Sequence, residues 1–363
     1  MNLGTFSNLS GNYKEIGLQE VKEFSNIPEA ESIIFSDAMY DVAKINETIK
    51  QIETYYPELL EELIEVAKEF HRPVEQLRFV QDSYLFGGGC SLGALKPESN
   101  VDGKMYLFRT YDMDPMITEM RLCSTSPRNF YNHTGFSSHY FGRSDGMNEH
   151  GLCVMFASCG MPVGNYPGMQ KPQVSGFNFM VVVRLFLEKC RTIKEVIDLF
   201  LQIPIASNVN LLVADGNNEI AILETLNGIK EYSIIDDNHA FLTNHAVLEE
   251  IKKQEKYSLN QSEVRENKMK EFFCNPTLNS KESINQMIQM EYPDGITSLN
   301  YKESFGTVYS VIFNVTDKTL NYSFGSSKHN PMFQIKVGEV AEHMAVPVNL
   351  PNKSYGKEFW RVN

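Results

Sequence analysis

The sequence predicts an α+β fold, in which helices and antiparallel strands occupy separate stretches of the chain. Three observations support this. Residues 13–90 show helical hydrophobic periodicity together with an excess of acidic side chains. From residue 90 onward, short apolar runs are joined by turn sequences, as in hairpin-linked strands. The segments follow the order helices, strands, two helices, strands, helices, strands, which differs from the strand–helix alternation of a doubly wound parallel sheet.

The first quarter of the chain is predicted to be helical. A stripe of apolar side chains at helical spacing runs through residues 58–70, with acidic side chains on the opposite face. Pro57 stands where a first-turn proline belongs, residues 71–73 end the run, and residues 74–80 can form one further short helix. Residues 1–89 hold seven Lys and Arg against sixteen Asp and Glu. The acidic excess is therefore explained by the solvated faces of amphipathic helices.

At the glycine run of residues 87–89 the pattern changes to strands. The segment 91–95 and the segment 104–111 are short runs joined by an Asp-Gly turn within residues 100–103. Two such runs around an Asp-Gly turn predict a β-hairpin.

The rest of the chain continues with strands and helices, and neither an internal repeat nor a low-complexity linker interrupts it. The expected elements are a strand at 152–156 after a turn at 145–151, helices at 177–188 and 193–201, strands at 210–214, 219–225 and 239–243, a charged helical region at 247–270, and strands at 307–314 and 319–324.

Composition excludes several classes of protein. The chain has 363 residues, of which 42% are hydrophobic and 22% charged, as in globular proteins. Its net charge of −13 argues against nucleic acid and anionic membranes as partners. The apolar stretch 177–187 is too short to span a bilayer, and no secretory leader is visible. The six cysteines lack metal-binding spacing. We therefore expect a cytoplasmic protein with reduced thiols, no metal, no nucleic-acid partner and no membrane partner.

Cys90 is the strongest candidate for a chemical role. No Lys-Ser/Thr follows the glycine run, so a phosphate-binding loop is not indicated. Arg109 and Asp112 stand at the end of the returning strand, where a hairpin can bring both beside Cys90. A cationic neighbour lowers the pKa of a thiol, and a carboxylate can hold an amine. The alternatives are a flexible glycine connector, a buried cysteine that acts as a small hydrophobe, and a surface ion pair.

These residues, with several further strings, resemble the acyl-CoA:6-aminopenicillanate acyltransferase family (peptidase family C45). That family is part of the N-terminal nucleophile (Ntn) amide hydrolases and is related to choloylglycine hydrolases and penicillin V acylases. The similar strings, in the family's order, are the propeptide-like helix 57–63, Gly89-Cys90, the Arg-x-x-Asp strand 108–112, the Asn-Glu turn 145–151, the Thr-Asn-His segment 241–245 and the closing strand 306–311.

The resemblance implies a fold and a division of the chain. The fold is a four-layer αββα sandwich, with two stacked antiparallel sheets between helix layers. Residues 1–89 correspond to a helical propeptide that packs on the core, and residues 90–363 to the catalytic core. Self-cleavage is expected between Gly89 and Cys90, and a homodimer of cleaved protomers is expected.

The resemblance also implies residue roles and a substrate class. Cys90 is the nucleophile, Arg109 favours its thiolate, Asp112 holds its α-ammonium and Asn244 donates an N–H to the oxyanion. The substrate is a small N-acyl amide, no cofactor is needed, and acyl-CoA is a co-substrate if acyl transfer replaces hydrolysis. A catalytically silent relative that acts as a small-molecule binding protein is the alternative.

The sequence departs from the choloylglycine hydrolases in three ways. The stretch 155–159 offers Ser158 where they carry an asparagine or a tyrosine, the C-terminal strand lacks their late arginine, and 89 residues precede Cys90. All three favour the acyltransferase branch.

His245 follows Asn244 directly, so a Cys-His protease arrangement is an alternative, although neighbouring residues of a strand point to opposite faces.

Residues 131–140 form an aromatic and His-rich stretch soon after Asp112. It either lines a substrate pocket or is an ordinary packed loop. Tyr111 and Tyr131, together with Ser158, are the candidate substrate contacts. His133 and His139 are expected at the surface.

Overall fold

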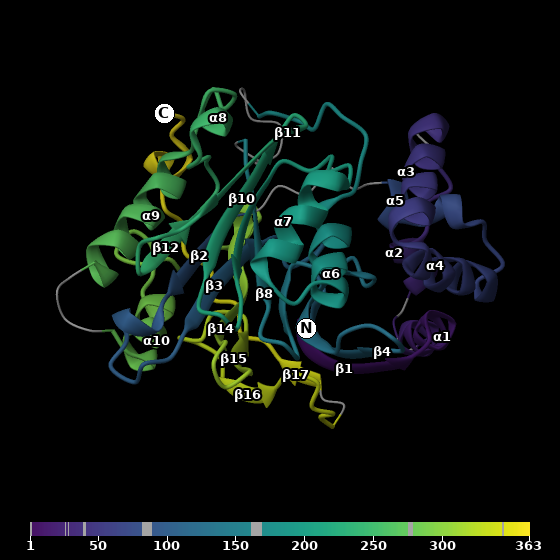
Figure 1. Ribbon diagram of the computed structural model, residues 1–363, viewed down its shortest axis with the longest axis horizontal. Coiled ribbons are helices and arrows are strands. Elements are labelled where there is room, and N and C mark those ends of the chain that lie inside the picture. Colours follow the sequence, from purple (N-terminus) through teal and green to yellow (C-terminus); the bar gives the residue numbers. More distant parts are fainter. Residues whose placement is uncertain are drawn as a thin grey trace.

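The structure, a computed structural model, consists of two stacked β-sheets with helices on both outer faces (Figure 1). It describes residues 2–25, 27, 29–38, 41–81, 89–160, 169–274, 279–342 and 345–363. The segment before residue 82 contains β1 (Leu3–Gly11), α1 (Tyr13–Phe24), α2 (Ala30–Ile34), α3 (Val42–Tyr55), α4 (Pro57–Glu69) and α5 (Arg78–Gln81).

The remaining elements are, in chain order, β2 (Gly89–Leu95), β3 (Tyr106–Met113), β4 (Met120–Pro127), β5 (His133–Ser138), β6 (Gly142–Arg143), β7 (Asp145–Asn148), β8 (Cys153–Ser158), α6 (Phe179–Lys189), α7 (Ile193–Gln202), β9 (Val209–Ala214), β10 (Ile220–Leu226), β11 (Ile229–Ile234), β12 (His239–Leu242), α8 (Glu249–Lys252), α9 (Asn260–Phe273), α10 (Lys281–Gln289), β13 (Leu299–Asn300), β14 (Phe305–Asn314), β15 (Thr319–Phe324), β16 (Phe333–Lys336) and β17 (Ala345–Pro347).

Within the described residues the strands form two sheets. The larger sheet has the order β11-β10-β9-β8-β7-β5-β4-β1-β17, with β6 beside β5. The smaller sheet has the order β12-β2-β3-β14-β15-β16, with β13 beside β14. Strand pairs are antiparallel except for β1 and β4, which run parallel. Both sheets therefore consist mainly of hairpin-linked strands, as expected.

Contacts between the two sheets, and between each sheet and its helices, define four layers. β2 of the smaller sheet packs against β8 of the larger sheet, α6 and α7 cover the outer face of the larger sheet, and α9 and α10 cover the smaller one (Figure 1). The predicted α+β class and the four-layer αββα sandwich are thus confirmed.

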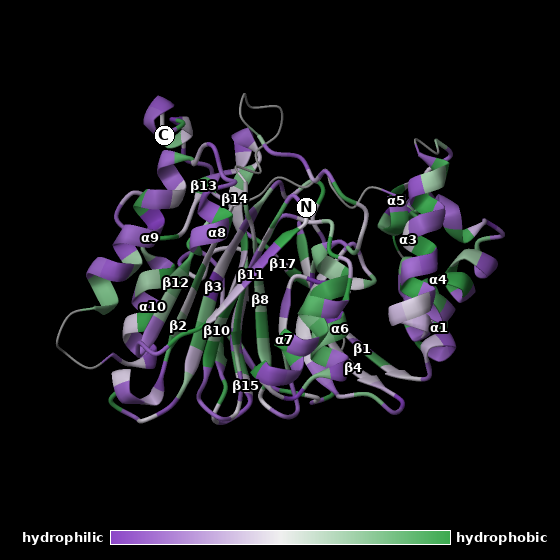
Figure 2. Ribbon diagram, turned by 45° about the horizontal axis from the view of Figure 1, so that its top comes forward, coloured by the Kyte–Doolittle hydropathy of each residue, from purple (hydrophilic) through white to green (hydrophobic). Residues whose placement is uncertain are grey.

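The hydrophobic interior lies between these layers (Figure 2). Helix α6 is largely hydrophobic (Figure 2), and ten of its side chains, Phe179 through Glu188, are buried. Its start is set by Asn178, whose side chain accepts the N–H of Val181. By contrast, α9 is mostly hydrophilic (Figure 2). None of the helices in the described part of the chain combines the length and the apolar character that a bilayer crossing requires.

Buried charges join the N-terminal helices to the sandwich. Glu62 of α4 pairs with Arg184 of α6 at 2.6 Å, and both side chains are fully buried. Tyr13 and Tyr56 each donate a hydrogen bond to Glu188 of α6. Since a buried ion pair that loses one partner typically destabilises a fold by about 3–5 kcal/mol, these contacts hold the helices in place.

Several elements differ from the sequence expectation. Residues 3–11, for which no element was expected, form β1 inside the larger sheet. The charged region 247–270 is helical only in part, because an irregular segment separates α8 from α9. The stretch 131–140 contains β5. The expectation of an exposed His133 was wrong: its side chain is fully buried, and burial lowers its pKa to about 3.

Candidate active site

Gly89 and Cys90 open the central strand β2 of the smaller sheet. In register with β3, Gly89 lies opposite Asp112 and Cys90 lies opposite Tyr111. A Cβ atom on residue 89 would lie 1.8 Å from the ring of Phe305, so this position accepts only glycine without rearrangement. The predicted hairpin therefore brings the candidate residues together, and its glycine is explained by close packing. Gly87 and Gly88 lie outside the described residues.

Cys90 is buried among three polar neighbours. Nη2 of Arg109 lies 3.1 Å from the Cys90 Sγ, and the Cys90 N–H donates to Oδ1 of Asn244 at 2.8 Å. Nη1 of Arg265 donates to the Cys90 carbonyl at 2.6 Å. Burial raises the pKa of Cys90 to about 11, although the Arg109 and Arg265 guanidinium groups act in the opposite direction. In the intact chain the thiol is therefore protonated at neutral pH.

Arg109 is held in a cage between the two sheets. Its Nη1 donates to the Ser144 carbonyl at 3.0 Å and to the Asp145 carboxylate at 3.1 Å. The guanidinium lies 4.7 Å from the ring centre of Tyr111 and 5.5 Å from that of Tyr309. All these side chains are buried. Because Nη1 is fixed by Ser144 and Asp145 and the guanidinium lies against two aromatic rings, Nη2 is directed at the thiol.

Asp112 points away from Arg109, toward α9, as strand alternation requires. Thr307 donates to its Oδ1 at 2.6 Å, and Nη1 of Arg265 lies 3.6 Å from its Oδ2. This Oδ2 atom is buried and has no hydrogen-bond partner among the described residues. Burial raises the pKa of Asp112 to about 6, with Arg265 and Thr307 acting in the opposite direction. On the strand next to Gly89, a buried carboxylate oxygen thus has an ion-pair partner in Arg265 but accepts no hydrogen bond from the described residues.

Asn244 follows β12 and uses both ends of its amide. Its Oδ1 accepts from the Cys90 N–H and, at 2.9 Å, from Nη2 of Arg265. Its Nδ2 donates to the Ser158 carbonyl at 3.0 Å and to the Ser158 hydroxyl at 3.3 Å. Its own backbone N–H donates to the Ser262 hydroxyl at 2.8 Å. The side chain is thereby fixed beside the nitrogen of Cys90.

Two carboxylates, the half-buried Glu255 and the buried Glu224, hold the segments that follow Ser158 and Asn244. Glu255 accepts the N–H of Gly160 at 3.0 Å and that of Ala246 at 2.7 Å, so it links the segment after Ser158 to the segment after Asn244. Burial raises the pKa of Glu255. Glu224 accepts the backbone N–H groups of residues 247 and 248, and burial raises its pKa to about 7.

His245 has partners of its own. Its Nδ1 lies 2.9 Å from the Ser262 hydroxyl and 3.2 Å from the Thr243 hydroxyl, and its Nε2 lies 3.2 Å from Glu266. These contacts turn the imidazole toward α9, whereas the Asn244 amide faces Cys90. The geometry gives no support to a Cys-His pair.

The other sequence candidates divide into two groups. Tyr111 lies beside Cys90, and Ser158 contacts Asn244. Tyr131 instead packs edge-to-face against His150, with ring centres 4.5 Å apart. Among the described residues, no group of three or more His, Cys, Asp or Glu side chains is arranged to hold a metal ion.

Sequence reasoning missed four residues of this centre: Arg265, Asp145, Tyr309 and Glu255. Arg265 and Glu255 belong to the charged stretch 247–270, where isolated charges are normally solvated. Asp145 was noted only as part of a turn. No local pattern marks these residues, because their partners are distant in sequence.

A family model described as acyl-coenzyme A:6-aminopenicillanic acid acyl-transferase matches residues 99–329. A comparison with curated protein sequences finds no match.

Solved structures with some similarity include a mutant of the conjugated bile acid hydrolase from Clostridium perfringens, at 12% identity, with 73% of this chain and 99% of that chain covered and a TM-score of 0.41. Penicillin V acylase from Agrobacterium tumefaciens has 15% identity, 68% and 86% coverage and a TM-score of 0.44. An N-acylethanolamine-hydrolyzing acid amidase ortholog from Caenorhabditis elegans has 14% identity, 62% and 93% coverage and a TM-score of 0.41.

The family model spans more than half of the chain and agrees with the resemblance found in the sequence motifs. The chain therefore belongs to the acyl-coenzyme A:6-aminopenicillanic acid acyl-transferase family.

Proposed function

We propose that this chain cuts itself between Gly89 and Cys90 and then acts on linear amide bonds of small N-acyl compounds through a thioester on Cys90. Residues 1–89 are the propeptide and residues 90–363 the catalytic core. The observation that carries the proposal is the placement of Cys90. Its sulfur lies 3.1 Å from Nη2 of Arg109, and its nitrogen donates to Asn244. Across the strand pair from Gly89, Oδ2 of Asp112 accepts no hydrogen bond from the described residues.

Self-cleavage converts the backbone nitrogen of Cys90 into an amine. The Cys90 sulfur forms a bond to the Gly89 carbonyl carbon, the C–N bond breaks, and the thiol proton goes to the departing nitrogen. Water then hydrolyses the thioester, which gives Gly89 a carboxylate and restores the Cys90 thiol. The new amine lies where Asn244 already accepts a hydrogen bond. As an ammonium group it would also supply a hydrogen-bond donor to Oδ2 of Asp112, which has none among the described residues.

The cleaved form then has the base that the intact chain lacks. An α-amine has an ordinary pKa of about 7.7–8.0, so at neutral pH it can accept the thiol proton. The thiolate, favoured by Arg109, attacks the substrate carbonyl. Nδ2 of Asn244 donates to the resulting oxyanion in place of its longer bond to the Ser158 hydroxyl. The leaving amine takes the proton back, and water or an acceptor amine releases the acyl group from Cys90.

A direct test combines mass spectrometry with a substrate panel. The purified full chain should yield a fragment that begins at Cys90, and this preparation should release amines from N-acyl amides. Running the panel with and without acyl-CoA separates hydrolysis from acyl transfer. A full-length chain that is nevertheless fully active would overturn self-cleavage. A cleaved chain that turns over no amide would favour a binding protein.

Replacing Asp112 by asparagine should remove most turnover, because the amide keeps the shape but loses the charge that holds the ammonium of Cys90. We expect kcat for amide hydrolysis to fall by at least about tenfold, as for the loss of a charge-assisted hydrogen bond. The exposed control Asp198→Asn should retain parental kcat. Activity within a few-fold of the parent would remove Asp112 from the mechanism.

The same substitution should stabilise the intact chain at neutral pH. The folded pKa of Asp112, about 6, lies above its unfolded value of about 3.9, so the folded state binds the proton more tightly. The protonated Asp112 carboxyl therefore stabilises the folded state at low pH, and this contribution to the free energy of unfolding is lost as the pH rises through 6. In an uncleaved Cys90→Ala background, Asp112→Asn should therefore raise Tm at pH 7 and change it little at pH 4. An equal effect at both pH values would contradict this.

Glu255→Gln should loosen the segments that carry Asn244 and Ser158. The glutamine keeps one acceptor oxygen but places an NH2 group against a backbone N–H donor. We expect kcat to fall between about 10- and 100-fold with little change in KM, because misplacement of a reacting group acts on the chemical step. The exposed variant Glu249→Gln is the matched control. A rise in KM at constant kcat would argue against a positioning role.

A further inference from the structure

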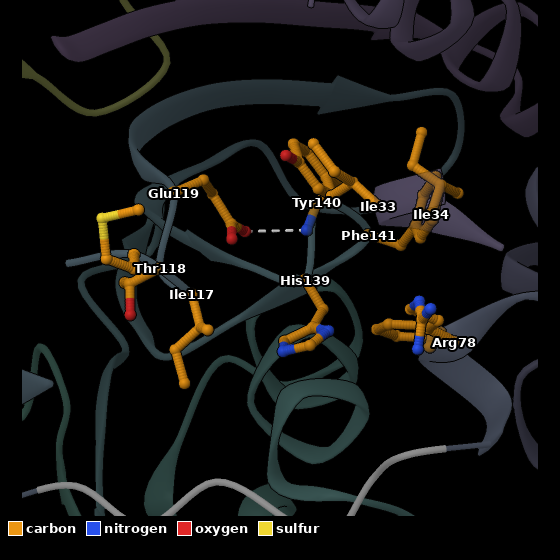
Figure 3. Close-up of a pocket in the computed structure, with 11 residues that line it drawn as sticks. Ile33, Ile34, Arg78, Ile117, Thr118, Glu119, His139, Tyr140 and Phe141 are labelled. Carbon is orange, nitrogen blue, oxygen red and sulfur yellow. Dashed lines mark hydrogen bonds between the residues drawn. The ribbon is translucent and has the colours of Figure 1, made fainter. Parts of the chain in front are cut away.

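A pocket of about 540 Å³ lies where the N-terminal helices meet residues 116–119 and 139–141 (Figure 3). The carboxylate in its wall, that of Glu119, accepts the N–H of Tyr140 at 2.7 Å. Neither Gly89 nor Cys90 is among the described residues that line this pocket. The side chains that border an acyl group on Cys90 are better indicated by the surroundings of Gly89.

The absence of a side chain at residue 89 is required by packing rather than by backbone conformation. The φ angle of Gly89 lies outside the left-handed region that favours glycine. An ideal Cβ atom at this position would lie 1.8, 2.5 and 2.7 Å from Cζ, Cε1 and Cε2 of Phe305. The ring of Phe305 therefore fills the space beside the Cα atom of Gly89.

The ring of Phe305 is held in this place by its neighbours. Phe305 is buried, and Phe359 and Trp360 pack edge-to-face against it, with ring centres 5.2 and 5.4 Å away. On another side, the guanidinium of Arg265 lies 5.7 Å from the centre of the ring. Because protein interiors are close-packed, a ring enclosed in this way moves aside for an extra methyl group only at an energetic cost.

Phe305 lies on the same face of the smaller sheet as Asp112. In the strand register Gly89 lies opposite Asp112, and Asp112 lies opposite Thr307. Phe305 and Thr307 are two residues apart on β14, so their side chains point to the same face. Thr307 donates a hydrogen bond to Asp112 on this face. The ring thus crosses β3 and reaches Gly89 on the side where the Asp112 carboxylate lies.

Aromatic cover of a strand glycine recurs in this fold. A Cβ atom on Gly4 or on Gly93 would lie 2.1 Å from the nearest ring atom of Phe324 or Phe108, respectively. Such pairs stabilise glycine-containing strands, so packing alone accounts for an aromatic ring at these positions. Gly89 differs from Gly4 and Gly93 because its carbonyl is the one that Cys90 attacks in the proposed self-cleavage.

Self-cleavage and turnover place an acyl group on the same sulfur atom. In the proposed mechanism the Cys90 Sγ first carries Gly89 as a thioester and later carries the acyl group of the substrate. This sulfur is buried and lies 3.1 Å from Nη2 of Arg109. The carbon next to the substrate carbonyl is therefore the counterpart of the Gly89 Cα atom, beside the ring of Phe305.

We propose that Phe305 determines acyl specificity, and that the substrates are N-acyl amides whose acyl group has no branch on the carbon next to the scissile carbonyl. The inference rests on the proposed function, because it assigns the counterpart of Gly89 in the substrate. A methyl branch on that carbon would meet the ring as a Cβ atom on residue 89 would. A branch one carbon further along the chain is not subject to this restriction.

The first experiment tests the ring against residue 89 itself. Gly89→Ala should slow self-cleavage by a factor of about 10 to 200, the usual effect of one carbon too many in a filled apolar site. Adding Phe305→Leu should restore cleavage to within a few-fold of Phe305→Leu alone, because leucine has no atom at the positions of Cζ, Cε1 and Cε2. Phe324→Leu, which shortens the ring beside Gly4, is the matched control and should restore nothing.

The rate of cleavage is followed by intact-mass spectrometry during cell-free synthesis of the full chain, and circular dichroism verifies the fold of each variant. Cleavage of Gly89→Ala at the parental rate would overturn the contact between ring and residue 89. Equal restoration by Phe305→Leu and Phe324→Leu would do the same, because the effect would then not depend on the ring beside Gly89.

The second experiment uses the parent protein and compares three acyl groups of equal size on one amine. These are pentanoyl, 3-methylbutanoyl and (R)-2-methylbutanoyl. With its chain in place of the Gly89 nitrogen, the (R) isomer carries its methyl group where a Cβ atom on residue 89 would stand. Its kcat/KM should be lower than that of pentanoyl by a factor of about 10 to 200. The 3-methylbutanoyl amide should stay within a few-fold of pentanoyl.

Cleaved Phe305→Leu protein separates the ring from the lower intrinsic reactivity of a branched amide, which is the same for every variant. The ratio of kcat/KM between pentanoyl and (R)-2-methylbutanoyl should fall at least about tenfold in Phe305→Leu and stay unchanged in Phe324→Leu. A parent that hydrolyses all three amides equally, or a ratio that ignores Phe305→Leu, would overturn the specificity and leave the amidase in place. A chain that neither cleaves nor hydrolyses any amide would refute the proposed function and the specificity together.

Discussion

Cys90→Ala is expected to leave the chain in one piece and without amidase or acyltransferase activity. The substitution removes the atom that attacks Gly89 and the atom that later carries the acyl group. Intact-mass spectrometry should find only the full-length chain, and activity should fall to the uncatalysed rate. Because Cys90 is buried beside Arg109 and a methyl group fits the same space, the fold should be retained, which circular dichroism can verify.

Two further cysteine variants accompany this experiment, one as a control and one as a test of the nucleophile. Cys274 is exposed, so Cys274→Ala should cleave and turn over substrate like the parent. Cys90→Ser tests whether a hydroxyl suffices; we expect slower cleavage, because the hydroxyl is the weaker nucleophile. An alanine variant of Cys90 that still cleaves at Gly89 would remove the thiol from the processing step.

Asn244→Ala is expected to lower kcat by about 10²–10³, the usual effect of removing one oxyanion donor, with a small change in KM. His245→Ala should lose some stability, through its contacts with Ser262 and Glu266, but keep kcat within a few-fold of the parent. The two variants are to be measured on the same amide, with protein that has already been cleaved. In a Cys-His mechanism the order is reversed: His245→Ala abolishes acylation, and Asn244→Ala has the smaller effect.

A third variant separates the two ends of the Asn244 amide. Asn244→Asp keeps an oxygen acceptor for Arg265 and for the nitrogen of Cys90 but has no N–H to donate. If the donor matters, aspartate should be as defective as alanine. If activity recovers with aspartate, the role of Asn244 is to place the amine of Cys90, and the oxyanion donor lies elsewhere.

Local patterns were enough to predict the elements that depend on short-range chemistry. The apolar stripe and Pro57 predicted α4, and the Asp-Gly turn predicted the hairpin of β2 and β3 that joins Cys90 to Arg109 and Asp112. The strands β1 and β4 were not predicted, because polar residues interrupt any alternation along them. Their strand conformation depends on neighbours elsewhere in the sheet.

The site was predictable only where it coincides with such local patterns. Arg265 lies in a charged helix whose hydrophobic residues give little indication of a buried face, yet its guanidinium is fully buried against Cys90 and Asn244. A sequence does not mark which charge of a charged stretch turns inward, because the partner that compensates its burial is supplied by another part of the fold. The same holds for Glu255, which accepts the N–H of nearby Ala246 and that of Gly160, distant from it in the chain.

The place of β1 in the larger sheet links the timing of synthesis to the proposed cut. β1 lies between β4 and β17, and its first residues pair with residues 345–347. A ribosome makes β1 before the other strands of this sheet and β17 after them, so the pairing of residues 3–5 with 345–347 forms only once those later residues exist. After a cut at Gly89, the earlier fragment would still contribute β1, which lies between two strands of the later fragment, β4 and the edge strand β17. The product is then a nicked molecule in which the two fragments share one sheet, so residues 1–89 stay bound after cleavage.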